Sequence, residues 1–174
     1  MTGNGGSDPR VLGRLRSVDG TGVARMEDRF ATDIDDLWSA LIAPDRLARW
    51  YGQVEGDLRL GGEFRVLVHG SGWEGTGRVE ACDPPRRLVV KTRERQQQFD
   101  ILLEATLTAD GDQTILVLEA RGMGLDKLPF YGVGWQIHLE DLAAYLGGRE
   151  RGDAAIRWAE LAPAYQRAAV HIGR

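Results

Sequence analysis

The sequence predicts an α+β fold in which a curved antiparallel sheet wraps around one long C-terminal helix. A helical repeat of apolar residues over 33–51 precedes a region, 58–121, in which they recur at every second position, and a second helical repeat covers 133–146. This change of period, from about 3.6 to about 2 residues, separates helices from strands. Short consecutive strands joined by tight turns form an antiparallel sheet. A sheet that grips a helix encloses a cavity, which indicates small-molecule binding.

The composition is typical of one folded domain and argues against several classes of partner. The chain has 174 residues, of which 43% are hydrophobic and 28% charged, and its net charge is -4. Its basic residues are scattered, which disfavours nucleic acid. No apolar stretch has the length of a signal peptide or a membrane span, and the lone Cys82 excludes an internal disulfide. We therefore expect a cytoplasmic protein without membrane insertion.

The first elements are expected to be two strands and two short helices. Residues 1–9 are Gly-rich and polar and are predicted to be disordered. Strands over 11–18 and 22–31 follow, joined by an Asp-Gly pair that favours a hairpin turn. Asp33 is expected to cap a helix that Pro44 ends, and Pro44 begins a second helix because proline fits the first helical turn.

Five further strands are predicted, over 64–69, 75–81, 88–93, 99–108 and 114–120. Because side chains alternate between the two faces of a sheet, parity separates the residues into two sets. One set is apolar and is expected to meet the helix: Phe64, Val66, Val68, Phe99, Ile101, Leu103, Ala105, Leu107, Leu116, Leu118 and Ala120. The outer set mixes polar and charged residues (Arg65, His69, Asp100, Glu104, Glu119, Arg121) with the apolar Leu67, Leu102, Ile115 and Val117.

The long helix is predicted over 133–146, and the two glycines that follow it end the helix. The first domain is expected to span 10–148. Phe130-Tyr131-Gly132, directly before it, indicates a lid hinge or a plain connector. The remaining residues, 149–174, form a helical extension in which Pro163 is expected to kink or restart the helix. We expect the apolar residues of the outer sheet face to be covered, either by the apolar side of this extension or by a second subunit in a homodimer. The apolar side of the extension carries Trp158, Leu161 and Tyr165.

At the residue level the chain resembles the bacterial family named after the activator of the heat-shock protein 90 ATPase, within the START-like, helix-grip (SRPBCC) superfamily. The resemblance covers about 22–147 and lies in the segments 37–41, 44–50, 61–64, 77–80, 83–88 and 134–146. It implies a cavity between the sheet and the long helix, which relatives use for hydrophobic ligands. Some members of the superfamily are polyketide cyclases, and the family name implies co-chaperone work.

Motifs for cofactor, metal or nucleophilic chemistry are weak. Residues 70–75 match G-x-G-x-x-G, but their flanks have strand character, which favours a strand connection over a dinucleotide site. Neither the histidines nor Cys82 have metal-ligand spacing, and no G-x-S-x-G elbow occurs. His138, on the long helix, either exchanges a proton in the cavity or bonds a backbone carbonyl at its margin. We expect no cofactor, no metal and no catalytic residue.

These observations favour binding of a small hydrophobic ligand in the internal cavity, as in a carrier, a sensor or a sequestering protein. The candidate lining residues are Trp38, Trp50, Tyr51, Phe64, Val66, Trp73, Phe99, Phe130, Tyr131, Trp135 and His138. A cyclase or hydrolase, the enzymatic alternative, needs a polar cluster in the cavity, with His138, Glu74, Tyr51 or Tyr131 as its source. A co-chaperone or protein-interaction module would instead have a filled core and an uncovered apolar outer face.

Overall fold

The computed structural model describes residues 10–97 and 99–172. The predicted disorder of residues 1–9 falls outside these described residues. The elements follow in the order β1 (Gly13–Val18), β2 (Thr21–Phe30), α1 (Ile34–Ile42), α2 (Pro44–Trp50), β3 (Gly52–Gly56), β4 (Glu63–Val68), β5 (Glu74–Asp83), β6 (Arg87–Glu94), β7 (Ile101–Asp110), β8 (Gln113–Met123), α3 (Leu128–Leu146) and α4 (Ala154–Ala169).

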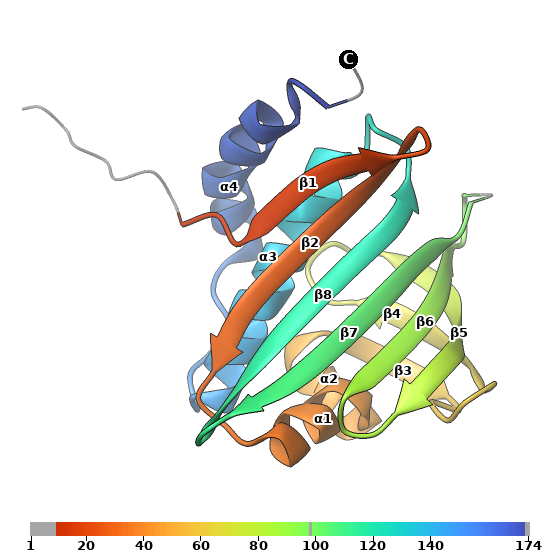
Figure 1. Cartoon of the computed structure of the whole chain (residues 1–174), viewed down its shortest axis with the longest axis vertical. Coiled ribbons are helices and arrows are strands. Elements are labelled where there is room, and N and C mark those ends of the chain that lie inside the picture. The colour runs from red at the N-terminus through yellow and green to blue at the C-terminus, as the bar shows by residue number, and fades with distance from the viewer. Residues whose placement is uncertain (1–9, 98, 173–174) are drawn as a thin grey trace, which may run out of the picture.

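The strands of the described residues form one eight-stranded antiparallel sheet with the order β1-β2-β8-β7-β6-β5-β4-β3. The sheet curves around α3, while α1 and α2 lie at one end of it (Figure 1). This is the predicted helix-grip arrangement. The first helix begins as expected, because the carboxylate of Asp33 accepts a hydrogen bond from the backbone N–H of Asp36 at 2.8 Å. None of the helices in the described part of the chain is long and apolar enough to cross a membrane.

The core lies between the concave face of the sheet and α3, as strand parity predicted. On β4, Phe64, Val66 and Val68 are buried, whereas Arg65 and Leu67 are exposed. The sequence analysis missed β3, because the segment GQVEG contains a single large apolar residue and shows no alternation. Backbone pairing with β4 holds this strand in place instead, and it extends the sheet at one edge.

Gly77 on β5 lies directly opposite Phe64 on β4, and the aromatic ring covers it. A β-carbon at position 77 would overlap that ring, which is itself buried. We expect Gly77→Ala to lower the free energy of unfolding by about 1–3 kcal/mol, as overpacking does in a filled core. Urea unfolding measures the change. Thr76→Ala, an exposed neighbour on the same strand, is the matched control, and equal effects of the two changes would contradict the prediction.

The long helix begins earlier than its apolar repeat suggested. It starts at Leu128, with a proline in its first turn, so Phe130-Tyr131-Gly132 are helical residues of α3. The prediction of a hinge or connector there is therefore wrong. The tail helix α4 is continuous from Ala154 to Ala169 and does not restart at Pro163. Pro163 is exposed, so the carbonyl group that loses its helical partner can be solvated.

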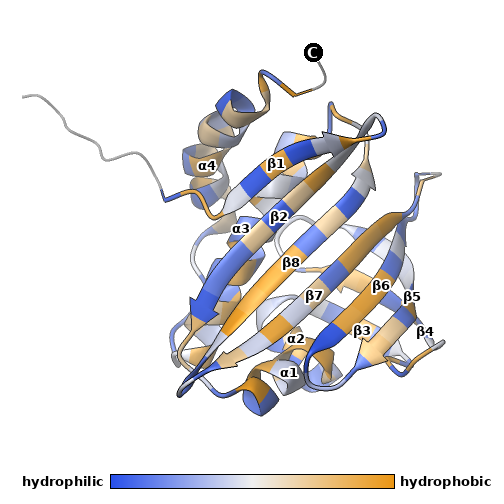
Figure 2. Ribbon diagram, in the orientation of Figure 1, coloured by the Kyte–Doolittle hydropathy of each residue, from blue (hydrophilic) through white to orange (hydrophobic). Residues whose placement is uncertain are grey.

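The prediction that the tail covers the outer face of the sheet is also wrong. Helix α4 packs on α3 and β1 instead (Figure 1). Leu161 and Tyr165 are buried, and the Tyr165 hydroxyl group bonds Gln136 on α3 and Gly13 on β1. Hydrophobic residues therefore remain on the outer face: Ile115 and Val117 on β8 are half-buried, and Leu67 on β4 is exposed. Figure 2 shows β8 as a strongly hydrophobic strand, because its buried inner residues add to these outer ones. There the carboxylate of Glu104 pairs with Arg121 at 2.7 Å and with Arg87 at 2.6 Å. Arginines held in this way cover apolar neighbours with their methylene groups.

Candidate ligand-binding cleft

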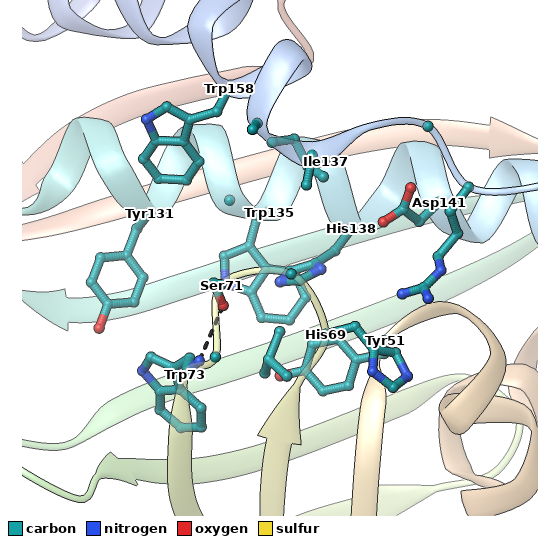
Figure 3. Close-up of a pocket in the computed structure, with 18 of the residues that line it drawn as sticks. Tyr51, His69, Ser71, Trp73, Tyr131, Trp135, Ile137, His138, Asp141 and Trp158 are labelled. Carbon is teal, nitrogen blue, oxygen red and sulfur yellow. Dashed lines mark hydrogen bonds between the residues drawn. The ribbon is translucent and has the colours of Figure 1, made fainter.

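A cleft of about 1300 Å³ lies between the sheet and α3. Its walls come from β6 and β7, from the loop between β4 and β5, from one side of α3, and from the segment 148–158 that leads into α4. Side chains from these elements converge on one space (Figure 3). On α3 the lining residues Tyr131, Trp135, His138 and Tyr145 repeat at the spacing of one helix face.

Three rings form a compact aromatic wall on one side of the cleft. The ring of Tyr51 stacks on that of Trp135 with 5.8 Å between centroids and 17° between planes. The imidazole of His138 meets both rings edge-on, at 5.0 Å from Tyr51 and 5.2 Å from Trp135. Tyr51 directly follows α2 and the other two lie on α3, so the wall depends on how α2 docks against the long helix. Stacked and edge-to-face contacts are the favourable geometries for such rings.

A second aromatic pair lies where α4 approaches α3. The rings of Phe130 and Trp158 are nearly parallel, at 7°, with centroids 6.3 Å apart. Phe130 is 42% exposed, which is unusual for so large an apolar side chain. Across the cleft, Trp73 lies over Gly75, where any side chain would overlap the indole. The glycine therefore allows this tryptophan to turn into the cleft instead of lying on the rim.

Burial controls the charge state of the titratable groups in the cleft. It lowers the pKa of His138 to about 4, with a further contribution from the nearby His69, so the imidazole is neutral at pH 7. Burial raises the pKa of the Tyr51 phenol and, together with the charge of Glu94, that of Tyr131. It also raises the pKa of Asp141 to about 6, against the opposing charge of Arg151. The aromatic side of the cleft is therefore uncharged near neutrality.

His69 lines the cleft, although strand parity placed it on the outer face. Strand β4 ends at Val68, and the chain then turns, so the alternation no longer applies. The backbone N–H of His69 donates to the carbonyl oxygen of Tyr51 at 2.9 Å. Its ring nitrogen Nε2 donates to the carbonyl oxygen of Ala48 at 2.8 Å, because a carbonyl can only accept. These two bonds fix the imidazole against the end of α2.

The structure brings part of the predicted lining together. The predicted residues that line the cleft are Tyr51, Trp73, Phe130, Tyr131, Trp135 and His138. The others pack in the core or against it: Trp38, Trp50, Phe64, Val66 and Phe99. Both buried tryptophans come from α1 and α2, and the indole N–H of Trp50 donates to the carbonyl of Ala40 at 2.9 Å. Glu74, a suggested source of polarity, pairs with Arg95 at 3.4 Å and is exposed.

Several lining residues were missed. Ile137 and Asp141 lie on the same side of α3 as His138, and helical spacing could have found them. Thr92 and Glu94 on β6 follow from strand parity only when the pairing of β6 with β7 is known. The contribution of residues 148–158 had no signal in the sequence, because it depends on where α4 docks.

The loop over 70–75 is a strand connection, as predicted. Residues 69–73 join β4 to β5, and Glu74 and Gly75 already belong to β5. The backbone N–H of Val68 donates to the carbonyl of Trp73 at 2.8 Å, which closes a hairpin. Within residues 10–97 and 99–172, no group of three His, Cys, Asp or Glu side chains could hold a metal ion. A hydrogen bond from His138 to a carboxylate would favour acid–base chemistry, and His138 forms none within the same residues.

Comparison with known proteins places these features in context. The family model described as "Activator of Hsp90 ATPase homolog 1-like protein" matches residues 31–147. No curated protein matches the sequence. The crystal structure of CalU16 from Micromonospora echinospora is 27% identical, with a TM-score of 0.74 over 90% of this chain and 95% of that one.

Two more distant structures share the fold. DynU16, a protein in the dynemicin biosynthetic locus, is 24% identical with a TM-score of 0.68, over 75% of this chain and 50% of that one. A conserved protein from Enterococcus faecalis is 16% identical with a TM-score of 0.74, over 93% of this chain and 92% of that one. The similarity to the Enterococcus faecalis protein extends over nearly the whole length of both chains.

Proposed function

The chain belongs to the family of Activator of Hsp90 ATPase homolog 1-like proteins, with the START-like helix-grip fold, and we propose that it binds a small, mostly apolar molecule in the cleft between the sheet and α3. Such a protein acts as a carrier, a sensor or a sequestering agent. The observation that carries the proposal is the aromatic wall of Tyr51, Trp135 and His138, which faces a cleft and stays uncharged at neutral pH.

The size of the cleft supports a substantial ligand. Its volume of about 1300 Å³ exceeds the roughly 300–1,000 Å³ of typical small-molecule sites, so several rings or a long chain fit within it. Aromatic side chains give large contact areas at low entropic cost. The phenols of Tyr51 and Tyr131 are protonated at neutral pH, since a phenol titrates near 10 and burial raises the pKa of each further, so they can donate a hydrogen bond to a polar end of the ligand.

Binding is favoured over catalysis by the environment of His138. A general acid or base needs a pKa near the working pH and a partner that orients it. Burial lowers the pKa of His138 to about 4, and its neighbours at close range are the faces of two aromatic rings. This environment suits an imidazole that contributes to an apolar wall.

Native mass spectrometry tests the proposal directly. The mass of the purified protein under native conditions is compared with its denatured mass, and we expect a non-covalent surplus whose fragmentation identifies the ligand. If the protein is purified without ligand, it is titrated with a panel of fatty acids, polycyclic aromatics and polyketides. A mass that stays unchanged against the whole panel would refute the proposal.

Trp135 should contribute strongly to binding. We expect Trp135→Leu to weaken the tightest ligand of that panel about tenfold, because it removes one half of a stacked pair from the wall. Leu60→Ala is the matched control, since Leu60 is 66% exposed and lies away from the cleft. Tryptophan fluorescence titration measures both affinities, and equal affinities for the two variants would contradict the assignment of this wall.

A further inference from the structure

The tail helix α4 supplies part of the cleft, although it lies outside the residues that define the family match. That match ends at residue 147, whereas the lining continues through the segment 148–158. Trp158 extends from α4 over α3 toward the space that Tyr131 and Trp135 also face (Figure 3). Its ring lies above Gly134 on α3, where a β-carbon would be in ordinary contact with the indole at 3.9 Å.

Polar contacts fix the position of Trp158. The adjacent Arg157 forms two hydrogen bonds with the carboxylate of Glu140 on α3, at 2.8 and 2.7 Å. Two turns further along α4, the hydroxyl group of Tyr165 donates to the side-chain oxygen of Gln136 at 2.6 Å, and both side chains are fully buried. Helix α4 is therefore a fixed wall, and Trp158 is displayed on it.

The geometry points to Trp158 as a specificity-determining residue, through which the cleft selects rigid planar ring systems over flexible acyl chains; this inference rests on the proposed ligand-binding function. The cleft presents two nearly parallel aromatic pairs, Phe130–Trp158 at 7° and Tyr51–Trp135 at 17°. A flat ligand stacks on such surfaces in one rigid orientation. A flexible chain makes poorer contact and loses conformational entropy when it is held against them.

The test uses two probes that differ in shape. Affinity for 1-aminoanthracene, a rigid planar fluorophore, is measured by fluorescence titration, and affinity for hexadecanoic acid by native mass spectrometry. The variant Trp158→Leu keeps an apolar side chain and removes the ring. We expect this variant to bind 1-aminoanthracene about fivefold more weakly, and its affinity for hexadecanoic acid to change by less than about twofold.

Two further variants separate recognition from stability. Trp158→Phe keeps an aromatic ring and should restore most of the affinity for 1-aminoanthracene. Ile156→Ala, on the same helix and 61% exposed, should change neither affinity. If Trp158→Leu weakens both probes equally, or weakens neither while both bind the wild-type protein, the specificity role is overturned and ligand binding stands. If neither probe nor the wider panel binds the wild-type protein, ligand binding itself is overturned, and this role with it.

Discussion

Replacing Tyr165 by phenylalanine is expected to lower the free energy of unfolding by about 2 kcal/mol, although it removes only one oxygen atom. The hydroxyl group is fully buried, so water cannot replace its partners. It donates to the side-chain oxygen of Gln136 at 2.6 Å and accepts from the backbone N–H of Gly13 at 2.9 Å. The change leaves the half-buried amide of Gly13 without its acceptor, which costs more than a lost surface hydrogen bond.

The loss of the Tyr165 hydroxyl group should destabilise segments beyond α4, because Tyr165 belongs to a polar network that joins three parts of the chain. The side-chain oxygen of Gln136 also accepts from the backbone N–H of Leu12 at 3.0 Å, and its amide nitrogen donates to the carbonyl of Arg10 at 2.6 Å. The network thus connects the segment before β1 with α3 and α4. In Tyr165→Phe we expect the amides of Leu12 and Gly13 to exchange hydrogen faster than in the wild-type protein.

Urea unfolding and amide hydrogen exchange measure the two effects. Gln166→Ala, the exposed neighbour on α4, is the control and should change stability by less than about 0.5 kcal/mol. Tyr165→Ala should cost more, about 4 kcal/mol, because it adds a cavity to the lost hydrogen bonds. A Tyr165→Phe protein as stable as the control, with unchanged exchange at Gly13, would show that the network does not anchor α4.

A strand is easiest to predict from the sequence where its side chains alternate between burial and exposure. On β4, for example, Phe64, Val66 and Val68 alternate with exposed neighbours, and this pattern alone locates the strand and its inner face. The segment of β3 lacks it, because Val54 is its one buried apolar side chain and backbone pairing defines the strand. The start of α3 was missed because Tyr131 and Gly132 precede the clear apolar repeat.

The candidate site was harder to predict because lining and core residues have the same composition. Trp50 and Tyr51 are adjacent, yet the first is buried against α1 and the second faces the cleft. The end of α2 turns them in different directions, which sequence spacing does not reveal. Trp158 contributes only because Gly132 lets α4 approach α3: a β-carbon at Gly132 would lie 2.6 Å from the ring of Tyr165. Such long-range fits are properties of the folded chain.

The titration of the cleft should show two opposing effects of pH on stability. Burial lowers the pKa of His138 from 6.5 to about 4, so the unfolded chain binds more protons at this site between these values, and stability is lost as pH falls. Burial raises the pKa of Asp141 from 3.8 to about 6, so here the folded protein binds more protons, and stability is gained as pH falls from 6 to 4. In the wild-type protein the two contributions largely cancel.

Single substitutions should therefore reveal slopes of opposite sign. Asp141→Asn removes the stabilising protonation. As pH falls from 6.5 to 4.5, we expect its free energy of unfolding to decrease by about 2 kcal/mol relative to that of the wild-type protein. His138→Phe keeps an aromatic ring against Tyr51 and Trp135, and it should gain a similar amount over the same interval. Each value is a difference from the wild-type protein at the same pH, so the titration of carboxylates elsewhere cancels. Asp36 and Glu104 are two of these, and hydrogen bonds to their neighbours lower the pKa of each.

Urea unfolding at half-unit steps of pH provides these differences. The groups that face Asp141 are Arg151 on the linker, Glu140 on α3 and His69 after β4, and all remain in both variants. The double variant should follow the wild-type dependence, because both unusual titrations are then absent. Two single variants whose curves run parallel to wild type would mean that water reaches both groups freely. The cleft would then lack the low polarity that its aromatic wall implies, and the binding of an apolar ligand would lose its physical basis.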